Sequence, residues 1–350
     1  VESRGFLAMF SAPARHALPI LLCAALQSAL AWAPPPAAHV ARLGCVGGRR
    51  GTSLFAPSSL TLASSGARED VAGLRPVLLC PAQFGTARDY SVLKADLRER
   101  GFALYPAPLT RLSWLRIVPS ILTPEFFAGT LTPSRTLGFF YEAIEEALSD
   151  IEKDFPGEKV SFLGHSIGGW VARSYIAEVM GEEGARARVA ALVTLGTPHN
   201  SAPDGSPLAL VDQTRGLLKY INDNFPSGWP LEKERVACVA GKGTTGPEKL
   251  SSLLDFSSER VWDKERSRSK LIEETVALAS YLPLCGGAFG VEGDGLIPVQ
   301  TALMPDTRHL ILDDCNHAAF IPSIGNSLLL PDSYKWYGSA GLIDEWSEFL

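Results

Sequence analysis

The chain has 350 residues, of which 46% are hydrophobic and 20% charged, with a formal net charge of −6. This is enough apolar material for one large α/β domain or two small ones. A mildly acidic chain lacks the basic patch that nucleic-acid binding requires, so DNA and RNA are not expected partners. The sequence contains neither a metal-ligand spacing nor a phosphate-cradling glycine loop, so no metal and no cofactor are expected.

The first 70 residues differ in composition from the rest, because no Asp or Glu occurs from residue 3 to residue 68. An apolar run at 17–31, too short to indicate a membrane span, ends in the A-x-A pattern of residues 29–31. This is typical of a signal peptide over about residues 9–31. The following Arg-, Ser- and Ala-rich stretch is typical of a transit peptide, so we expect a two-part plastid (chloroplast) address; secretion with a disordered linker is the alternative.

From residue 71 onward, short apolar runs alternate with helical patterns, as in a parallel sheet built from right-handed crossovers. Strands are expected at 76–80, 102–105, 160–164, 190–195, 235–240 and 309–312, and helices at 90–100, 137–155 and 170–180. The predicted fold class is therefore α/β, with a mostly parallel central sheet flanked by helices.

Three segments interrupt this alternation and are expected to be cap or lid insertions of one domain spanning residues 71–350. Residues 110–136 carry many apolar side chains among three prolines, which indicates either packed core or a lid over an apolar substrate. Residues 200–234 and 242–290 are expected to be long and irregular, and such loops inside a compact domain are usually functional or disordered.

Residues 164–168 (GHSIG) match the G-x-S-x-G nucleophile elbow. The chemistry needs a sharp strand-to-helix turn that lifts a serine hydroxyl clear of the sheet, with small residues on either side. An apolar strand precedes the motif and an amphipathic helix follows it, so Ser166 is predicted to be a nucleophile. A glycine-rich turn without chemistry is the alternative.

A serine hydroxyl needs a base to take its proton. His317 follows the last predicted strand, at the carboxyl edge of the sheet where such sites lie. His165 is too close to the nucleophile in the chain for useful geometry, His199 follows a strand, and His309 lies within one. His317 is therefore the predicted base.

The acid that orients the base should precede it in the chain, on another loop at the same edge. Asp294 lies between two glycines in the turn 293–298 (GDGLIP), which would present one carboxylate. Asp314 is the alternative, although it would have to fold back on a short loop to reach His317.

A tetrahedral intermediate needs two backbone N–H donors for its oxyanion. One is expected from Ile167, directly after the nucleophile. The other is expected from Gln83, in the loop after the first strand, with Phe84 as its alternative. A plain turn without this role is the other interpretation of that loop.

Four cysteines lie beyond the presumed targeting region: Cys80, Cys238, Cys285 and Cys315. None is in a C-x-x-C pair, so isolated buried thiols are expected. A Cys285–Cys315 disulfide is the alternative.

With these residues placed, the chain resembles the lipase-like branch of the α/β-hydrolase superfamily, and in particular plant and cyanobacterial, plastid-type hydrolases related to GPI inositol-deacylases. The resemblance runs from about residue 76 to the C-terminus and is carried by the stretches 78–90, 164–169, 195–199, 212–220, 293–299 and 336–339. It implies an α/β-hydrolase fold with Ser166 as nucleophile and Asp294 as acid. Asn316-His317 looks like the lipase base loop.

The chain departs from the lipase pattern at two places. Pro81-Ala82 replaces the usual His-Gly of the oxyanion loop, and Asn200-Ser201 replaces the common Gly after the LGTPH stretch. Residues 212–220 (DQTRGLLKY) are shared with the plant branch, and an amphipathic helix near the cap is the plain interpretation of them.

The expected activity is hydrolysis of a carboxylic ester, with an acyl lipid as the expected partner and peripheral membrane contact as a further expectation. An acyltransferase or thioesterase using the same three residues is the alternative. A non-catalytic binding protein on a hydrolase scaffold is a third hypothesis, from a different class.

Overall fold

The computed structural model describes residues 71–200, 212, 214–249, 264–318 and 334–350, with residues 264–273 described by their backbone only. The expected signal and transit peptides, residues 1–70, lie outside the described residues and stay predictions. Among the described residues, no helix has both the length and the apolar composition needed to cross a membrane.

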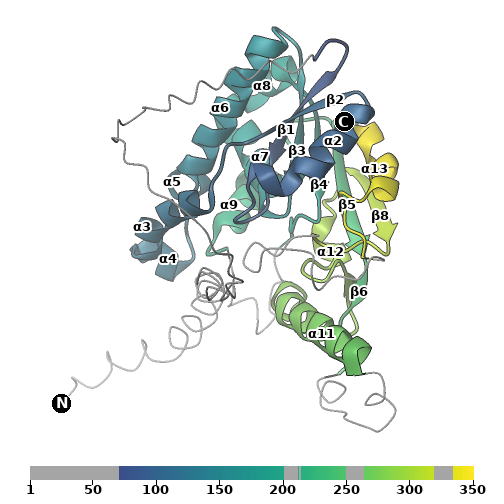
Figure 1. The fold of residues 1–350 in the computed structure, drawn as a ribbon. Coiled ribbons are helices and arrows are strands. Elements are labelled where there is room, and N and C mark those ends of the chain that lie inside the picture. The colour runs from purple at the N-terminus through teal and green to yellow at the C-terminus, as the bar shows by residue number, and fades with distance from the viewer. Residues whose placement is uncertain (1–70, 201–211, 213, 250–263, 319–333) are drawn as a thin grey trace, which may run out of the picture.

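A six-stranded parallel sheet forms the centre of the molecule (Figure 1), and all six predicted strands are confirmed. The strand order is β2-β1-β3-β4-β5-β8. Their bounds are β1 Arg75–Cys80, β2 Phe102–Pro106, β3 Val160–His165, β4 Val189–Leu195, β5 Val236–Lys242 and β8 Arg308–Asp313. A short antiparallel pair, β6 Thr244–Thr245 and β7 Glu292–Gly293, accompanies the sheet.

The register brings the carboxyl ends of the strands to one edge. Cys80 at the end of β1 pairs with Gly164 of β3, and His165 at the end of β3 pairs with Leu195 of β4. Because β1 has β2 on one side and β3 on the other, the order reverses here, and ligands of open α/β sheets bind at such a reversal.

Alternating side chains of β1 bury both faces of the sheet. Leu78 and Cys80 pack into one core with α6 (Gly138–Asp154) and α7 (Ile167–Tyr175). Val77 and Leu79 pack into the opposite core with α2 (Ser91–Glu99) and α13 (Ala340–Trp346). Figure 1 shows α6 and α8 (Gly181–Arg188) on one side of the sheet and α2 with α13 on the other. Each such side chain contributes roughly 1.5–3 kcal/mol through its burial.

The three helices predicted from the sequence are found, and the structure contains further helices that were not predicted. The predicted helices 90–100, 137–155 and 170–180 correspond to α2, α6 and α7, the last continued by a π-helical turn. Outside the insertion 110–136, the other helical elements are η1 Ala87–Tyr90, η3 Ile176–Met180, α8 Gly181–Arg188, α9 Leu217–Asn224, η4 Lys233–Arg235, α11 Lys264–Leu284, α12 Val299–Ala302 and η5 Ser347–Phe349.

Two expectations for the insertions are corrected. Residues 242–290 are not irregular throughout, because α11 occupies 21 residues of them. Its sequence begins with alternating charges and becomes apolar only later, so no apolar stripe revealed it. Part of 200–234 is likewise helical, as α9, so the amphipathic helix expected from the DQTRGLLKY stretch is confirmed for its second half, residues 217–220.

The insertion 110–136 consists of short helices, each with a threonine N-cap or a proline in its first turn. They are η2 Arg111–Ile117, α3 Val118–Ile121, α4 Pro124–Ala128 and α5 Pro133–Thr136. Trp114 is buried and its ring centroid lies 5.5 Å from those of Phe84 and Phe139. The opposite side is exposed, with Leu122 at 76% and Phe127 at 66%. The insertion is therefore packed core on one side and open apolar surface on the other.

Candidate active site

Ser166 is the turn between β3, which ends at His165, and α7, which begins at Ile167. Its backbone has φ +56° and ψ −130°, a region that a residue with a side chain adopts only when its surroundings impose it. Here the Ser166 N–H donates to Leu195 O at 2.9 Å, and Ser166 O accepts from Gly169 N–H at 3.0 Å. This is the sharp strand-to-helix turn that the sequence motif predicted.

The glycines around Ser166 are required by close backbone approaches. A Cβ on Gly164 would lie 2.2 Å from Gly169 Cα, and a Cβ on Gly168 would lie 2.1 Å from Cys80 O. Real Cβ atoms do not approach backbone this closely, so a side chain at either position would force the turn open. The Gly168 contact also holds the turn directly against the end of β1.

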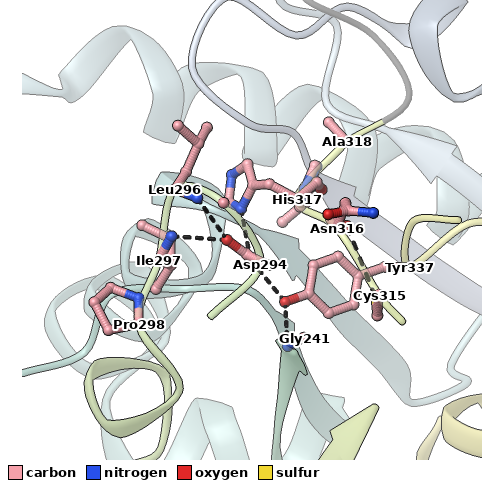
Figure 2. Close-up of polar contacts among 12 residues, drawn as sticks. Gly241, Asp294, Leu296, Ile297, Pro298, Cys315, Asn316, His317, Ala318 and Tyr337 are labelled. Atoms are coloured by element: carbon pink, nitrogen blue, oxygen red, sulfur yellow. Dashed lines mark hydrogen bonds and ion pairs between the residues drawn. The ribbon is translucent and has the colours of Figure 1, made fainter. Parts of the chain in front are cut away.

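His317 and Asp294 come together at the same edge of the sheet. His317 Nδ1 lies 2.8 Å from Asp294 Oδ2, and His317 N–H donates to Asp294 O at 2.8 Å. Both side chains are buried, and Figure 2 shows them pointing toward each other. Asp314 is exposed, and among the described residues no hydrogen bond or ion pair joins it to His317. The contact favours Asp294 over Asp314 as the partner of His317.

The Asp294 carboxylate is held by three further donors (Figure 2). Oδ1 accepts from the N–H groups of Leu296 at 3.0 Å and Ile297 at 2.7 Å. Oδ2 accepts from the Tyr337 hydroxyl at 2.8 Å. Because a carboxylate only accepts, the proton of the His317 ring lies on Nδ1, and Nε2 keeps the lone pair that a general base needs.

His165, set aside as a base, has a connecting role that sequence reasoning missed. His165 Nε2 lies 2.9 Å from His317 O, and a carbonyl only accepts, so Nε2 donates. His165 Nδ1 then accepts from the Tyr90 hydroxyl at 2.7 Å, which itself accepts from Ala82 N–H at 2.8 Å. Burial lowers the pKa of His165 to about 3, so the ring is neutral. This chain of bonds joins the loop after β1, the elbow and the base loop.

The two proposed oxyanion donors lie where the elbow meets the loop after β1. Gln83 is exposed and Ile167 half-buried, and within the described part of the chain neither N–H donates to another residue. Phe84 has φ +59°, and its N–H is equally unused among the described residues. Gln83 and Ile167 therefore stay predictions, with Phe84 as the alternative to Gln83.

The other two histidines of the described residues, His199 and His309, lie outside this arrangement. His199 is fully buried, and its Nε2 lies 3.0 Å from Thr194 Oγ1. His309 contacts Met304 O. The described residues contain no group of three or more side chains that could hold a metal ion.

The four cysteines are free and buried, as predicted, and the alternative Cys285–Cys315 disulfide is wrong. Cys285 Sγ accepts from Gln300 Nε2 at 3.0 Å. Burial raises the pKa of Cys315, so this neighbour of the base loop is a neutral thiol.

Residues 214–216 form a turn that ties α9 to the insertion, and Asp212 caps it. Asp212 Oδ1 accepts from Thr214 N–H at 2.8 Å, and Asp212 Oδ2 accepts from Gly216 N–H at 2.6 Å. Arg215 lies over the Phe126 ring at 5.0 Å, and a Cβ on Gly216 would lie 2.1 Å from Gly129 O. The stretch thus has a structural role, which its sequence alone did not reveal.

Residues 126–232 match a family model described as the PGAP1-like alpha/beta domain. The six-stranded parallel sheet flanked by helices confirms the predicted α/β fold class. The match covers less than half of the chain and agrees with the resemblance over that segment; similarity to plastid-type proteins stays a prediction. No curated protein matches the chain.

Several solved structures are similar to the chain. The mature form of the lipase BlEst2 from Bacillus licheniformis has a TM-score of 0.40 and 15% identity, covering 70% of this chain and 86% of that chain. MGS-MChE2, an α/β hydrolase enzyme from a sediment metagenome of the Mar Chica lagoon in Morocco, has a TM-score of 0.34 and 15% identity, covering 79% and 91%. The product of gene lin2722 of Listeria innocua has a TM-score of 0.31 and 15% identity, covering 48% and 70%.

Proposed function

We propose that the chain is a serine hydrolase that cleaves a carboxylic ester of an acyl lipid through an acyl-enzyme on Ser166. The observation that carries the proposal is the 2.8 Å contact between His317 Nδ1 and Asp294 Oδ2, made by a loop that His165 ties to the strained serine turn. The family-model match supports a hydrolase in general terms.

In the acylation step, Ser166 Oγ forms a bond to the ester carbonyl carbon while His317 Nε2 takes the hydroxyl proton. The carbonyl oxygen becomes an oxyanion, for which the N–H groups of Gln83 and Ile167 are the proposed donors. The bond to the alcohol oxygen then breaks, and the His317 proton leaves with the alcohol.

Deacylation repeats these steps with water. His317 Nε2 takes a proton from water as its oxygen attacks the acyl carbon, and the Ser166–acyl bond breaks with return of that proton to Ser166. Asp294 stays ionised throughout and stabilises the imidazolium that forms in each step.

The exposed side of the insertion supports the choice of an acyl lipid and of peripheral membrane contact. Six large apolar side chains between residues 112 and 127 are exposed: Leu112, Leu115, Val118, Ile121, Leu122 and Phe127. An exposed apolar patch of this kind marks an interaction site on a protein surface.

Labelling by a fluorophosphonate probe tests the nucleophile. The wild-type protein should be labelled, Ser166→Ala should not, and Ser149→Ala, an exposed serine of α6, should be labelled like wild type. Absence of labelling of the folded wild-type protein would overturn the proposal.

Hydrolysis of p-nitrophenyl esters of increasing chain length, and of acyl lipid in vesicles, tests the substrate class. Phe127→Ser should lose activity on vesicles more than on soluble esters. Val92→Ser on α2, at 67% exposure a match for Phe127 at 66%, should not. Activity on acetate alone would contradict a lipid substrate, and a new ester formed with an added alcohol would favour acyl transfer.

Plastid location is a separate proposal that rests on the composition of residues 1–70. Fusion of residues 9–70 to a fluorescent protein, expressed in an alga with secondary plastids, should direct fluorescence to the plastid. Fluorescence in the medium would favour secretion instead.

A further inference from the structure

Tyr337 is a fully buried residue of the stretch 336–339 (WYGS). Its hydroxyl lies between β5 and the turn that carries Asp294, residues 293–298, called the acid turn below (Figure 2). It accepts from Gly241 N–H at 2.7 Å and lies 2.8 Å from Asp294 Oδ2. Since the N–H can only donate and the carboxylate can only accept, the hydroxyl proton points to Asp294. Burial raises the pKa of Tyr337 well above its ordinary value, which keeps that proton in place.

The ends of two strands leave room for this hydroxyl by carrying glycine. A Cβ on Gly196, after β4, would lie 2.5 Å from Asp294 Oδ2 and 2.8 Å from the Tyr337 hydroxyl. A Cβ on Gly241, in β5, would lie 2.9 Å from the same hydroxyl. Gly196 also has φ +52°, a conformation that favours glycine. The tyrosine–carboxylate pair is therefore enclosed by backbone on both sides.

Tyr337 and His317 share one oxygen of the carboxylate. Asp294 Oδ1 is occupied by two backbone N–H groups, while Oδ2 receives both the Tyr337 hydroxyl and the His317 ring. Donors to one oxygen divide its negative charge between them. Without the hydroxyl, the whole charge of Oδ2 would face His317.

We propose that Tyr337 is a positioning residue of the active site, which fixes the Asp294 carboxylate for His317 and limits how strongly that carboxylate stabilises the imidazolium. The proposal rests on the proposed function for its catalytic meaning, but the contact with Asp294 stands without it. If the carboxylate stabilised the imidazolium more strongly, His317 would stay protonated at higher pH and could not accept a proton there. The Tyr337 hydroxyl therefore extends the pH range in which neutral His317 can act as a base.

The other titratable groups around the Asp294–His317 pair come from β3, α11, the base loop and α13. His165 of β3 has its ring centroid 5.0 Å from that of His317, and burial lowers its pKa to about 3. Tyr281 of α11 and Cys315 of the base loop have pKa values raised by burial. Glu345 of α13, an exposed side chain, acts on Cys315 from further out. His165, Tyr281 and Cys315 are therefore neutral groups beside the pair.

Tyr337→Phe tests the proposal, with Tyr281→Phe as a matched control. Tyr281 is also a buried tyrosine that contacts the acid turn, from α11. Its hydroxyl accepts from Gly295 N–H at 2.7 Å and donates to Thr244 O at 3.3 Å, without a hydrogen bond to the carboxylate. Two quantities are measured from pH 4 to 9: the fluorophosphonate labelling rate, and the NMR titration of the His317 ring protons, assigned with His317→Gln.

In Tyr337→Phe, both midpoints should move up by roughly one pH unit, because an unshared carboxylate favours the charged ring. In Tyr281→Phe, both should stay at the wild-type value even if the rate falls. Equal midpoints in Tyr337→Phe and wild type, or equal shifts in both variants, would overturn the proposal. Should wild type fail to label, the proposed function fails, while the NMR titration still decides the role of Tyr337.

A measurement on the wild-type protein covers the case in which Tyr337→Phe does not fold. With ¹³C-labelled tyrosine, the Tyr337 Cζ resonance should move over the same pH range as the His317 ring protons, because both groups share Asp294 Oδ2. A Tyr337 resonance that is unchanged through the His317 titration would contradict the proposal.

Discussion

Two loops at the carboxyl edge of the sheet are held in opposite ways. In the acid turn, residues 293–298, the Asp294 carboxylate is 2% exposed and meets four donors. In the loop after β1, residues 81–86, Gln83 is exposed. Its neighbours are hydrogen-bonded, because Ala82 N–H donates to the Tyr90 hydroxyl and Gly85 N–H donates to Ala82 O. The acid–base half of the proposed site is therefore preorganised by four donors to one buried carboxylate, whereas the exposed Gln83 of the proposed donor half is held through the bonds of its neighbours.

The largest effect should come from the preorganised half. In Asp294→Asn the amide cannot accept on every side, the His317 ring loses its fixed tautomer, and the labelling rate should fall roughly 10⁴-fold. Asp314→Asn, which changes an exposed carboxylate of the base loop, should keep the wild-type rate. A large loss in Asp314→Asn with little loss in Asp294→Asn would reverse the acid assignment.

The loop that carries the proposed oxyanion donor Gln83 should respond to a change at Tyr90, which contacts it at Ala82. Tyr90→Phe removes the hydroxyl that joins Ala82 N–H to His165, so the loop should shift and the labelling rate should fall roughly 10- to 100-fold. Tyr105→Phe removes a hydroxyl that bonds Asp154 at 2.8 Å, outside this network, and should leave the rate unchanged. An unaffected rate in Tyr90→Phe would show that the loop is held without its hydroxyl.

The contact between the elbow and β1 should show in stability. Gly168→Ala places a Cβ 2.1 Å from Cys80 O, and urea unfolding should report a free energy of unfolding lower by roughly 1–3 kcal/mol. Gly341→Ala in α13 meets nothing within 4 Å and should be neutral or stabilising by up to about 1 kcal/mol. Similar stabilities for the two variants would contradict the close packing at the elbow.

The smallest effect concerns the bridge between the two halves, His165. Its pKa of about 3 in the folded protein lies below the ordinary value of 6.5, so between these pH values the unfolded chain binds the extra proton. Stability should therefore fall as the pH falls through that window, with His165 contributing at most about 1.4 kcal/mol per pH unit. Urea unfolding at pH 4 to 6.5 should show that the free energy of unfolding changes less with pH in His165→Gln than in wild type. An equal pH dependence in the two proteins would contradict a neutral buried ring.

The sequence by itself determined the elements whose signals are local. The six strands are short apolar runs. The turn at Ser166 is indicated by glycines, which are required there because backbone atoms approach closely. A period of two or of 3.6 residues, and a turn that tolerates no side chain, are properties of neighbouring residues, so they can be read without the fold.

Only the tertiary structure decided which distant groups meet. Asp294 and Asp314 are both carboxylates near His317 in the sequence, and the contact with Asp294 depends on how the acid turn lies against β5. His165 and Tyr337 gave no sequence signal for their contacts, since each acts on a residue far along the chain. Helix α11 likewise lacks an apolar stripe of its own. Long-range packing, unlike periodicity, leaves no local pattern, and this is why the turn at Ser166 was evident from the sequence while the contacts of Asp294, His165 and Tyr337 were not.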